Sequence, residues 1–328
     1  MIKRNICGVV FIILLSVLIT STVYSQEKLA QSGFQFLSVG QDARAAAMGE
    51  AFTTIEGVSN ALFYNPAGIA RIPSLVTVAA NYFTWIADIK YTSFSVAVNP
   101  WQGQYGVIGL SIQAIDYGEL QGTMVWKNPQ GYIDTEIFSP NAIAIGLGYG
   151  RALTERFVVG GHVKFVAQEL GKSVIPGEGV KKNIADVVAF DFGTIYRTGF
   201  KSFSFGMSVR NFSQELKFEE EGFQLPLTFK IGVSANAFDF FMPDQEKHSL
   251  LVTFDAVHPR SHAEYINVGT EYVFVNTFAL RLGYISGQDE YDYTAGFGVK
   301  QYGLEIDYAY TPFDAFDNVH RFSLRFSY

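Results

Sequence analysis

Bulky apolar residues recur at every second position along much of this chain, in segments of about ten residues. Within residues 141–151, alanines and glycines alternate with four bulky side chains, Ile143, Ile145, Leu147 and Tyr149. Successive side chains of a strand point to opposite faces of the sheet, so this alternation indicates β-strands. The pattern predicts an all-β protein.

The alternating segments follow one another through most of the chain. We expect strands near residues 74–83, 90–98, 104–115, 140–151, 156–169, 184–198, 202–212, 226–237, 248–257, 264–275, 277–286, 292–300, 302–311 and 318–328. These are fourteen segments, and most have the 9–11 residues that a tilted strand needs to cross a bilayer.

The composition of the less bulky face favours a membrane barrel over a soluble sandwich. A soluble sheet would bury its bulky face and expose a charged one, whereas this face is rich in Gly, Ala and Ser. Its scattered charges carry both signs, so they could pair across a lumen. The lumen charges that we select are Arg210, Lys230, Glu271, Arg281, Arg321 and Arg325. We therefore predict a fourteen-stranded antiparallel transmembrane β-barrel over residues 73–328.

The connections between the expected strands give an independent indication. Outer-membrane barrels alternate long outer loops with short inner turns. Long connections are expected at 116–139, 170–183 and 213–225, with turns of a few residues between them. One inner connection, 239–247, is longer than this scheme predicts.

Residues 1–25 have the layout of an export signal. Lys3 and Arg4 precede an apolar run over residues 6–19, and cleavage is expected near Ser25–Gln26. The alternative is a membrane-anchoring helix, although no cluster of basic residues follows the run. The signal predicts export, and with the barrel it predicts a location in the outer membrane, in contact with its lipid.

Net charge excludes one class of partner. Without Lys3 and Arg4 the chain keeps 22 of its 24 basic side chains and all 31 acidic ones. Such an acidic exported chain has no electrostatic basis for binding nucleic acid.

The sequence shows no recognised pattern of catalytic or cofactor-binding residues. His258 and His262 lie four residues apart, but Pro259 prevents the helix that would bring them onto one face. An exposed loop is the favoured interpretation. The glycines of residues 146–150 do not follow the spacing of a nucleotide-binding loop. We expect no enzymatic activity, no cofactor and no metal site.

Residues 26–72 are the one substantial segment outside the alternating pattern. A barrel of fourteen strands lined by small residues would be wide, so we predict that this segment is a plug inside its periplasmic end. Residues 44–52 suit a short helix apart from Gly49, and Asn65 with Pro66 suits a helix start. The alternatives are a periplasmic N-terminal domain and an amphipathic arm that lies outside the barrel. The plug residues that we single out are Arg44, Gly49, Asn65, Pro66, Ala67 and Gly68.

Two N-terminal motifs, GQDARAAAMGEAF (40–52) and SNALFYNPAGIARI (59–72), occur together with paired hairpins and the closing HRFSLRFSY. In this combination the chain resembles the PorV/PorQ family of outer-membrane barrels, which is related in fold to the FadL fatty-acid transporters. The resemblance implies a FadL-like barrel of fourteen strands and an N-terminal hatch with an Asn-Pro-Ala turn, here Asn65 to Ala67. It also implies a link to type IX secretion, in which the best-known PorV members associate with the translocon barrel and hand cargo to surface attachment enzymes.

Three functions remain open at this level. The first is an accessory of type IX secretion that binds partner or cargo proteins, and the second is a FadL-like transporter of a hydrophobic ligand. The third is a purely structural barrel. The loop 116–139 contains more apolar residues than a solvated loop needs, and it favours the first function. Its candidate partner-binding residues are Trp126, Tyr132 and Phe138.

Overall fold

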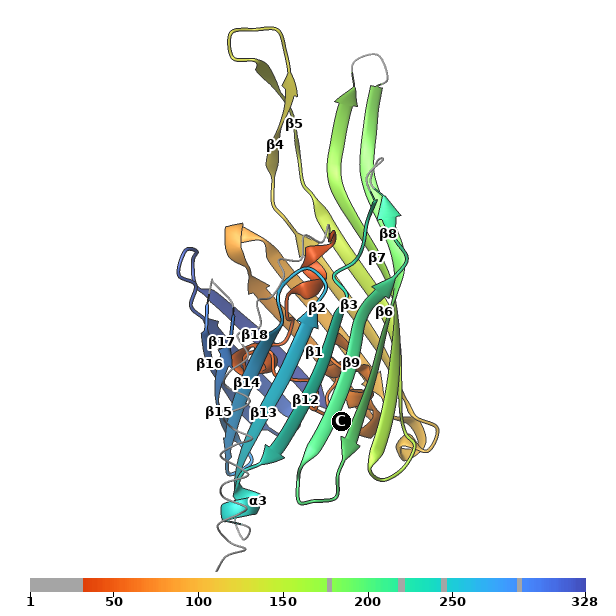
Figure 1. Ribbon diagram of the computed structural model, residues 1–328, viewed down its shortest axis with the longest axis vertical. Coiled ribbons are helices and arrows are strands. Elements are labelled where there is room, and N and C mark those ends of the chain that lie inside the picture. The colour runs from red at the N-terminus through yellow and green to blue at the C-terminus, as the bar shows by residue number, and fades with distance from the viewer. Residues whose placement is uncertain (1–31, 176–178, 218–221, 243–246, 288–290) are drawn as a thin grey trace, which may run out of the picture.

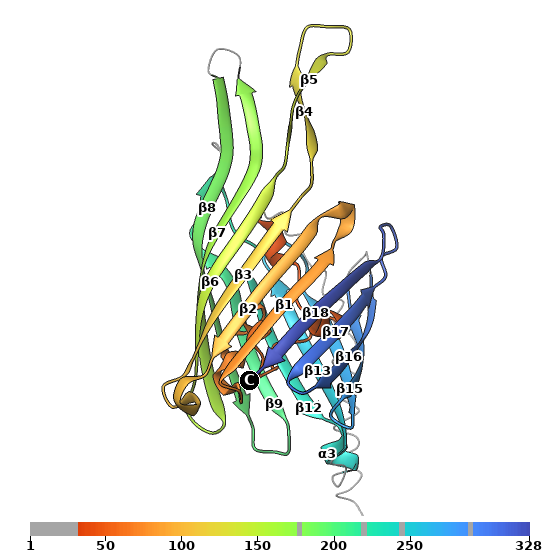
Figure 2. The same ribbon diagram turned by 180° about the vertical axis from the view of Figure 1, so that it is seen from behind.

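The computed structural model describes residues 32–175, 179–217, 222–242, 247–287 and 291–328. Within them, fourteen strands close into one barrel (Figures 1 and 2). These strands are β1 (Val76–Thr84), β2 (Lys90–Val98), β3 (Val107–Asp116), β6 (Asn141–Ala152), β7 (Phe157–Ile175), β8 (Gly179–Arg197), β9 (Ser204–Ser213), β12 (Thr228–Asn236), β13 (His248–Pro259), β14 (Tyr265–Phe274), β15 (Phe278–Ile285), β16 (Tyr293–Gln301), β17 (Leu304–Thr311) and β18 (Val319–Ser327).

The barrel strands follow the order of the chain, and every neighbouring pair is antiparallel. The sheet closes where β1 pairs with β18, with Asn81 opposite Ser323. Closure pairs the backbone of each strand on both sides, which the hydrocarbon of a membrane requires. The predicted fourteen-stranded antiparallel barrel is confirmed.

Two of the predicted long loops contain strands of their own, which the sequence reasoning missed. The connection 116–139 forms a hairpin of β4 (Leu120–Val125) and β5 (Tyr132–Phe138). The connection 213–225 contains the short pair β10 (Leu216–Lys217) and β11 (Gly222–Phe223).

The prediction of a loop over 170–183 is also wrong, because β7 and β8 run on beyond the barrel. The two strands stay paired as far as Ile175 and Gly179. Their pairing continues beyond Glu169 and Ala189, where the pairing with β6 and β9 ends. The β4–β5 and β7–β8 hairpins rise from one end of the barrel (Figures 1 and 2).

The two ends of the barrel differ in the length of their connections. We call the end with the tall hairpins the outer end and the end with short turns the inner end, after the usual asymmetry of outer-membrane barrels. At the inner end, Val275–Asn276 and Tyr302–Gly303 make tight turns with positive φ. The long inner connection noted in the sequence holds a single helical turn, α3 (Phe238–Phe241).

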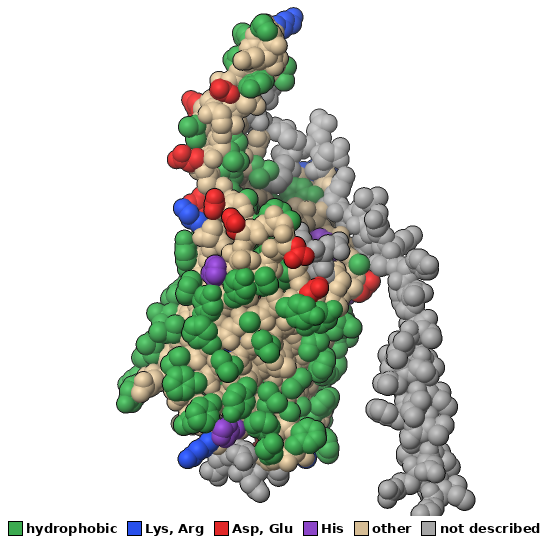
Figure 3. Space-filling model, turned by 90° about the vertical axis from the view of Figure 1, so that its left-hand side faces the viewer, with side chains coloured by type: hydrophobic (Ala, Val, Ile, Leu, Met, Phe, Trp, Pro, Cys, Tyr) green, Lys and Arg blue, Asp and Glu red, His purple; other side chains and the backbone are tan. Residues whose placement is uncertain are grey.

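The outer face of the wall is apolar, as the alternation predicts. Leu282 is 64% exposed, whereas its neighbour Arg281 is buried on the lumen side. Figure 3 shows hydrophobic side chains forming a broad band across the face in view, with charged side chains gathered mainly above and below it. A band of this kind is suited to lipid hydrocarbon.

Residues 32–72 run through the lumen. The chain meets outer-end residues at η1 (Gln35–Ser38), passes through α2 (Ala43–Ala47), η2 (Ser59–Phe63) and η3 (Pro66–Arg71), and begins β1 at the inner end. Two further short helices, η4 (Ile86–Asp88) and η5 (Pro100–Gly103), lie in connections between strands.

Among the described residues, every helix is too short or too polar to pass through a bilayer. The predicted signal peptide, residues 1–25, lies outside these residues. The boundary between a plug at 26–72 and a barrel at 73–328 stays a prediction.

Candidate functional site

The Asn65-Pro66-Ala67 turn is fixed by the side chain of Asn65. Asn65 Oδ1 accepts a hydrogen bond from the Ala67 amide at 3.1 Å and so caps η3, with Pro66 at its first position. Asn65 Nδ2 donates to the carbonyl oxygens of Thr53 (2.7 Å), Thr194 (3.2 Å) and Met207 (3.4 Å). Because Thr194 and Met207 lie on β8 and β9, this amide joins the lumen segment to two strands of the wall.

Glycines of the wall give the turn the room that it occupies. A side chain at Gly193 would overlap Asn65 Oδ1, and one at Gly160 would overlap the backbone between Pro66 and Ala67. The same relationship recurs elsewhere along the wall: Gly109 and Gly148 face Leu62, Gly150 faces Ile69 and Ala70, Gly206 faces Thr53, Gly269 and Gly283 face Met48 and Gly49, and Gly296 faces Ala47. Residues 43–72 therefore pack against the small-residue face of the strands. Gly68 is itself packed against Ile55 and Ala61.

The helix α2 is shorter than the sequence indicates. It covers Ala43–Ala47, because Gly49 and Glu50 both adopt left-handed backbone conformations (φ 61° and 60°) that end it. Asp42 caps its start by accepting from the Arg44 amide at 2.7 Å. The buried alanines pack against the lumen side of β15 to β18.

Arg44 joins α2 to the charges of the wall. Its Nε and one terminal nitrogen reach the two oxygens of Glu271 at 2.7 and 2.6 Å, which is a bidentate ion pair. Burial by itself would lower the pKa of the Arg44 guanidinium, but the Glu271 carboxylate raises that pKa well above its usual value. Glu271 also accepts from Arg281 Nε at 2.6 Å, and Arg281 bonds Asp307 at 2.6 Å.

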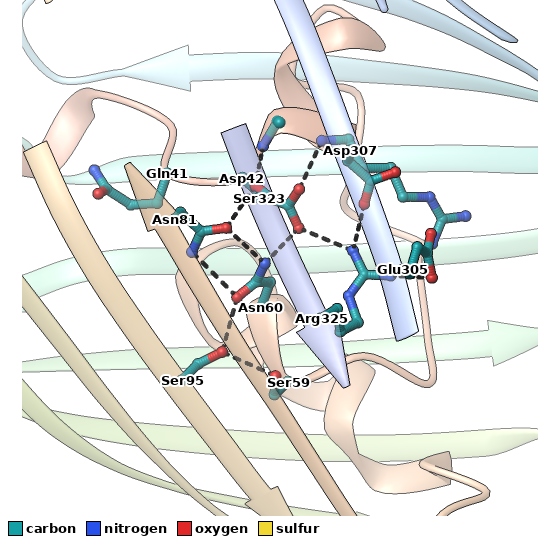
Figure 4. Close-up of polar contacts among 12 residues, drawn as sticks. Gln41, Asp42, Ser59, Asn60, Asn81, Ser95, Glu305, Asp307, Ser323 and Arg325 are labelled. Carbon is teal, nitrogen blue, oxygen red and sulfur yellow. Dashed lines mark hydrogen bonds and ion pairs between the residues drawn. The ribbon is translucent and has the colours of Figure 1, made fainter. Parts of the chain in front are cut away.

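A second polar network binds residues 42 and 60 to the place where the barrel closes (Figure 4). Asn60 Nδ2 donates to Asp42 Oδ2 at 2.7 Å and to Asn81 Oδ1, on β1, at 3.1 Å. From β18, Ser323 Oγ donates to Asn81 at 2.6 Å and accepts the Ala43 amide at 2.8 Å. The lumen segment thus contacts the first and the last strand of the barrel together.

Arg325, also on β18, extends this network toward β17. It bonds Glu305 at 2.9 Å and lies 3.4 Å from Asp307 and 3.5 Å from Asp42. Removing one of these carboxylates would leave the buried guanidinium with less counter-charge, which is costly in a buried site.

The other three predicted lumen cations, Arg210, Lys230 and Arg321, lie on β9, β12 and β18. Arg210 donates to the Leu37 carbonyl at 3.3 Å, and Lys230 donates to the Glu50 carbonyl at 3.3 Å. Arg321 bonds Thr311 and lies over the ring of Phe83 at 4.8 Å. Each of the six predicted lumen charges is therefore buried inside the barrel. Burial raises the pKa of the Glu50 carboxyl, although Arg321 and Lys230 lower it in part.

One buried hydrogen-bond network was not predicted from the sequence. Ser111 Oγ lies 2.9 Å from His162 Nε2, and His162 Nδ1 lies 3.0 Å from Asp191 Oδ2. Lys164 Nζ bonds the same Asp191 oxygen at 2.8 Å and donates to Asn211 Oδ1 at 2.7 Å. The network joins β3, β7, β8 and β9. Its signal in the sequence is that His162 and Lys164 share the lumen-facing register of one strand.

The Ser–His–Asp order is also that of serine hydrolases, but here its surroundings indicate a structural role. His162 reaches Ser111 across β6, over Gly146, where a side chain would block it. Leu62 packs over Gly148 beside the imidazole. The network braces the wall beneath the lumen segment.

Near its outer end the lumen contains a cluster of aromatic and aliphatic side chains, which the sequence reasoning missed. Phe83 and Tyr91 face inward and stack with their ring centroids 4.8 Å apart. Phe36 and Leu37, from η1, are buried against them in one cluster with Phe313. The expected wall of small and charged residues therefore omits this inward-facing aromatic cluster.

The sequence comparison identifies the family of the chain. A sequence profile described as type IX secretion system protein PorV matches residues 23–259, well over half of the chain. The chain belongs to the PorV family. Among curated protein sequences, none matches it.

Solved structures show that this PorV-family barrel shares its fold with FadL-like proteins. The toluene transporter TbuX of Ralstonia pickettii is 12% identical, with a TM-score of 0.60 over 88% of this chain and 98% of that one. The monoaromatic hydrocarbon channel CymD is 11% identical, with a TM-score of 0.58 over 88% and 98%. A FadL homologue of Pseudomonas aeruginosa is 11% identical, with a TM-score of 0.52 over 88% and 98%. At these identities the likeness shows the fold alone. Barrel and family together place the protein in the outer membrane.

The β4–β5 hairpin carries the predicted partner-binding residues of this PorV-family barrel. Trp126 and Tyr132 are exposed near its tip. Phe138 differs, because its ring packs against the backbone position of Gly171 on β7. Phe138 thereby supports the base of the hairpin, and Trp126 and Tyr132 are the two that remain accessible to a partner.

The two histidines considered as metal ligands are His258 and His262. His258 lies on β13 and bonds Glu264 at 2.9 Å, with both side chains largely exposed. In the part of the chain that the structure describes, no group of three or more His, Cys, Asp or Glu side chains is arranged to hold a metal ion.

Proposed function

We propose that this PorV-family protein is an accessory of type IX protein secretion that binds partner or cargo proteins at the outer face of the outer membrane. The observation that carries the proposal is the β4–β5 hairpin, which stands clear of the barrel (Figures 1 and 2). Val125 on this hairpin is 88% exposed, and Ile137, Trp126 and Tyr132 are exposed as well.

The physical argument is that this hairpin is poorly supported on its own. A two-stranded hairpin is only marginally stable in water, and the described part of β4 and β5 pairs with no third strand. Exposed apolar side chains on such an element mark a protein-binding surface. A partner protein would cover them and stabilise the hairpin.

Photo-crosslinking in cells that secrete type IX cargo tests the proposal. A crosslinking amino acid at Val125 should capture a secretion-system protein or a cargo protein with its C-terminal signal. The same amino acid at Trp101, exposed at the inner end, is the matched control and should capture neither. Capture of neither class from position 125 would contradict the proposal.

A second candidate is a transporter of hydrophobic small molecules, and the apolar cluster near the outer end of the lumen favours it. Partly buried side chains such as Trp85 and Ile86 pack against the cluster that contains Phe83, Tyr91 and Phe313. Structurally similar proteins are named as a toluene transporter and a monoaromatic hydrocarbon channel. A small aromatic ligand would be compatible with this lining.

Liposomes test the second candidate with toluene as the probe. Transport predicts faster uptake of labelled toluene by liposomes with the barrel than by empty ones, and a loss of this uptake in Phe83→Arg. Uptake equal to that of empty liposomes would exclude toluene transport. The double variant Trp126→Ser, Tyr132→Ser separates the two functions, because it should weaken partner capture and leave uptake unchanged.

We further propose that residues 26–72 close the barrel. The contacts of Arg44, Asn60 and Asn65 with the wall support this role. Deleting residues 40–72 should leave a barrel that still inserts, because the strands carry their own pattern, but that conducts small ions in planar bilayers. A deleted barrel that conducts no more than the intact one would contradict closure by this segment.

A further inference from the structure

The connection between β12 and β13 differs from the tight turns elsewhere at the inner end. It contains α3, whose single turn is held by the side chain of Asn236. Asn236 Oδ1 accepts from the amides of Phe238 (3.2 Å) and Leu250 (2.9 Å), and its Nδ2 donates to Asp239 Oδ1 at 3.0 Å. These bonds join the helix to both strands, so α3 has a defined position on the barrel.

The contacts of Phe238 place α3 on the lipid side of the wall and not over the lumen. The Phe238 ring meets the ring of Tyr272 edge-on, with centroids 6.3 Å apart. Tyr272 follows the lumen-facing Glu271 on β14 and therefore points outward. The helix lies beside the band of lipid-facing residues.

The exposed side of α3 is apolar and aromatic. Phe241 lies one helical turn beyond Phe238 on the same side; it is 80% exposed, and Met242 after it is exposed as well. From the neighbouring β8–β9 turn, Phe200 brings its ring to 5.8 Å from that of Phe240. These side chains form a patch that continues the lipid-facing band past the ends of the strands.

A lysine completes the patch. Lys201 Nζ donates to the Asp239 carbonyl at 2.7 Å and lies 4.4 Å from the centre of the Phe240 ring. Lys201 is exposed, so its ammonium group remains open to a further partner. Aromatic rings with a lysine at their edge are typical of side chains at a membrane–water interface.

We propose that α3, with Phe200 and Lys201, is an anchor in the inner leaflet of the outer membrane. Phe241 and Met242 insert at the boundary of the acyl chains, and the Lys201 ammonium binds lipid phosphate. A bilayer is the occupant because the patch is continuous with the lipid-facing band and lies beside outward-pointing Tyr272. The anchor fixes the depth of the barrel at the β12–β13 side.

Spin labelling at Phe241 tests this anchor in intact protein. The only cysteine of the chain, Cys7, is replaced by serine. In this Cys7→Ser background, Phe241→Cys carries a nitroxide label. The labelled protein is placed in vesicles of phosphatidylethanolamine and phosphatidylglycerol. Leu282→Cys, in the lipid-facing band, and Asp314→Cys, in an exposed outer loop, are the references for lipid and water. Retained heat-modifiable mobility shows that each labelled barrel is folded.

The anchor predicts that collisions of the Phe241 label with oxygen exceed those with a water-soluble nickel complex, as for the Leu282 label. A label at 241 as accessible to nickel as the one at 314 would overturn the proposal. Phe241→Trp adds a tryptophan at the proposed anchor. Lipids brominated near the headgroup should therefore quench the tryptophan fluorescence of this variant more strongly than that of the parent protein. Equal quenching of the two proteins would also overturn the proposal. Lys201→Gln should reduce the quenching in phosphatidylglycerol more than in phosphatidylcholine.

Discussion

Asn65 Oδ1 occupies the space that a side chain at Gly193 would fill. Gly193→Ala should therefore displace the Asn65 turn, with an overpacking cost of about 1–3 kcal/mol. We expect the barrel to assemble and to show raised conductance in planar bilayers. Gly161→Ala is the matched control, because a side chain there meets no atom within 4 Å. Equal conductance of the two variants would show that the fit at Gly193 does not hold the turn.

Removing Glu271 should cost more than removing Arg44. In Glu271→Gln, Arg44 and Arg281 both lose a buried carboxylate, and breaking such pairs costs about 3–5 kcal/mol. Arg44→Met leaves Glu271 paired with Arg281, so its cost should be smaller. Thermal unfolding in detergent measures both. The control is Arg197→Met, whose side chain is 51% exposed beside Glu56 and should cost less than about 1 kcal/mol.

Replacing Asp191 should be more harmful than replacing Ser111. Asp191→Asn leaves the Lys164 ammonium without its buried counter-charge, at a cost of about 3–5 kcal/mol. Ser111→Ala removes one hydrogen bond to His162, at a cost of about 1 kcal/mol. Chemical denaturation of the reconstituted barrel gives the order of the two values, and the reverse order would contradict a bracing role of Asp191.

A charge on the lipid face should impair insertion. Leu282→Arg places a guanidinium in the band of exposed apolar residues, at a cost of about 2–4 kcal/mol near the bilayer midplane. Leu282→Phe should be nearly neutral. The yield of heat-modifiable barrel after refolding into liposomes measures the difference, and similar yields would mean that this face does not meet hydrocarbon.

The barrel wall could be predicted from the sequence because each strand carries its own evidence. Alternation along residues such as Ile143 to Tyr149 needs no knowledge of distant partners, and closure follows from fourteen such segments. The tall hairpins were missed because their segments lack this local evidence. Beyond the membrane the alternation is irregular, as at Leu120–Val125, and Lys172 and Lys182 read as loop residues although they pair across β7 and β8.

The partners inside the lumen could be predicted only as a class. Periodicity places Glu271 inside, but it does not select Arg44, which lies 227 positions away in the chain. The inward aromatic residues were missed because the rule that bulky side chains face lipid fails near the outer end, where Phe83 and Tyr91 pack against η1. These relationships depend on how the segment 32–72 lies in the lumen, which no local pattern encodes.

The bonds from Asp42 and Asn60 to both β1 and β18 bear on the order of assembly. Ribosomes make the lumen segment before any strand, whereas Ser323 and Arg325 come among the last residues of the chain. Whatever the order of synthesis, the segment can complete these bonds only when β18 lies beside β1. A barrel in which β1 and β18 have not met would therefore lack the bonds that hold Asp42 and Asn60 at the closure.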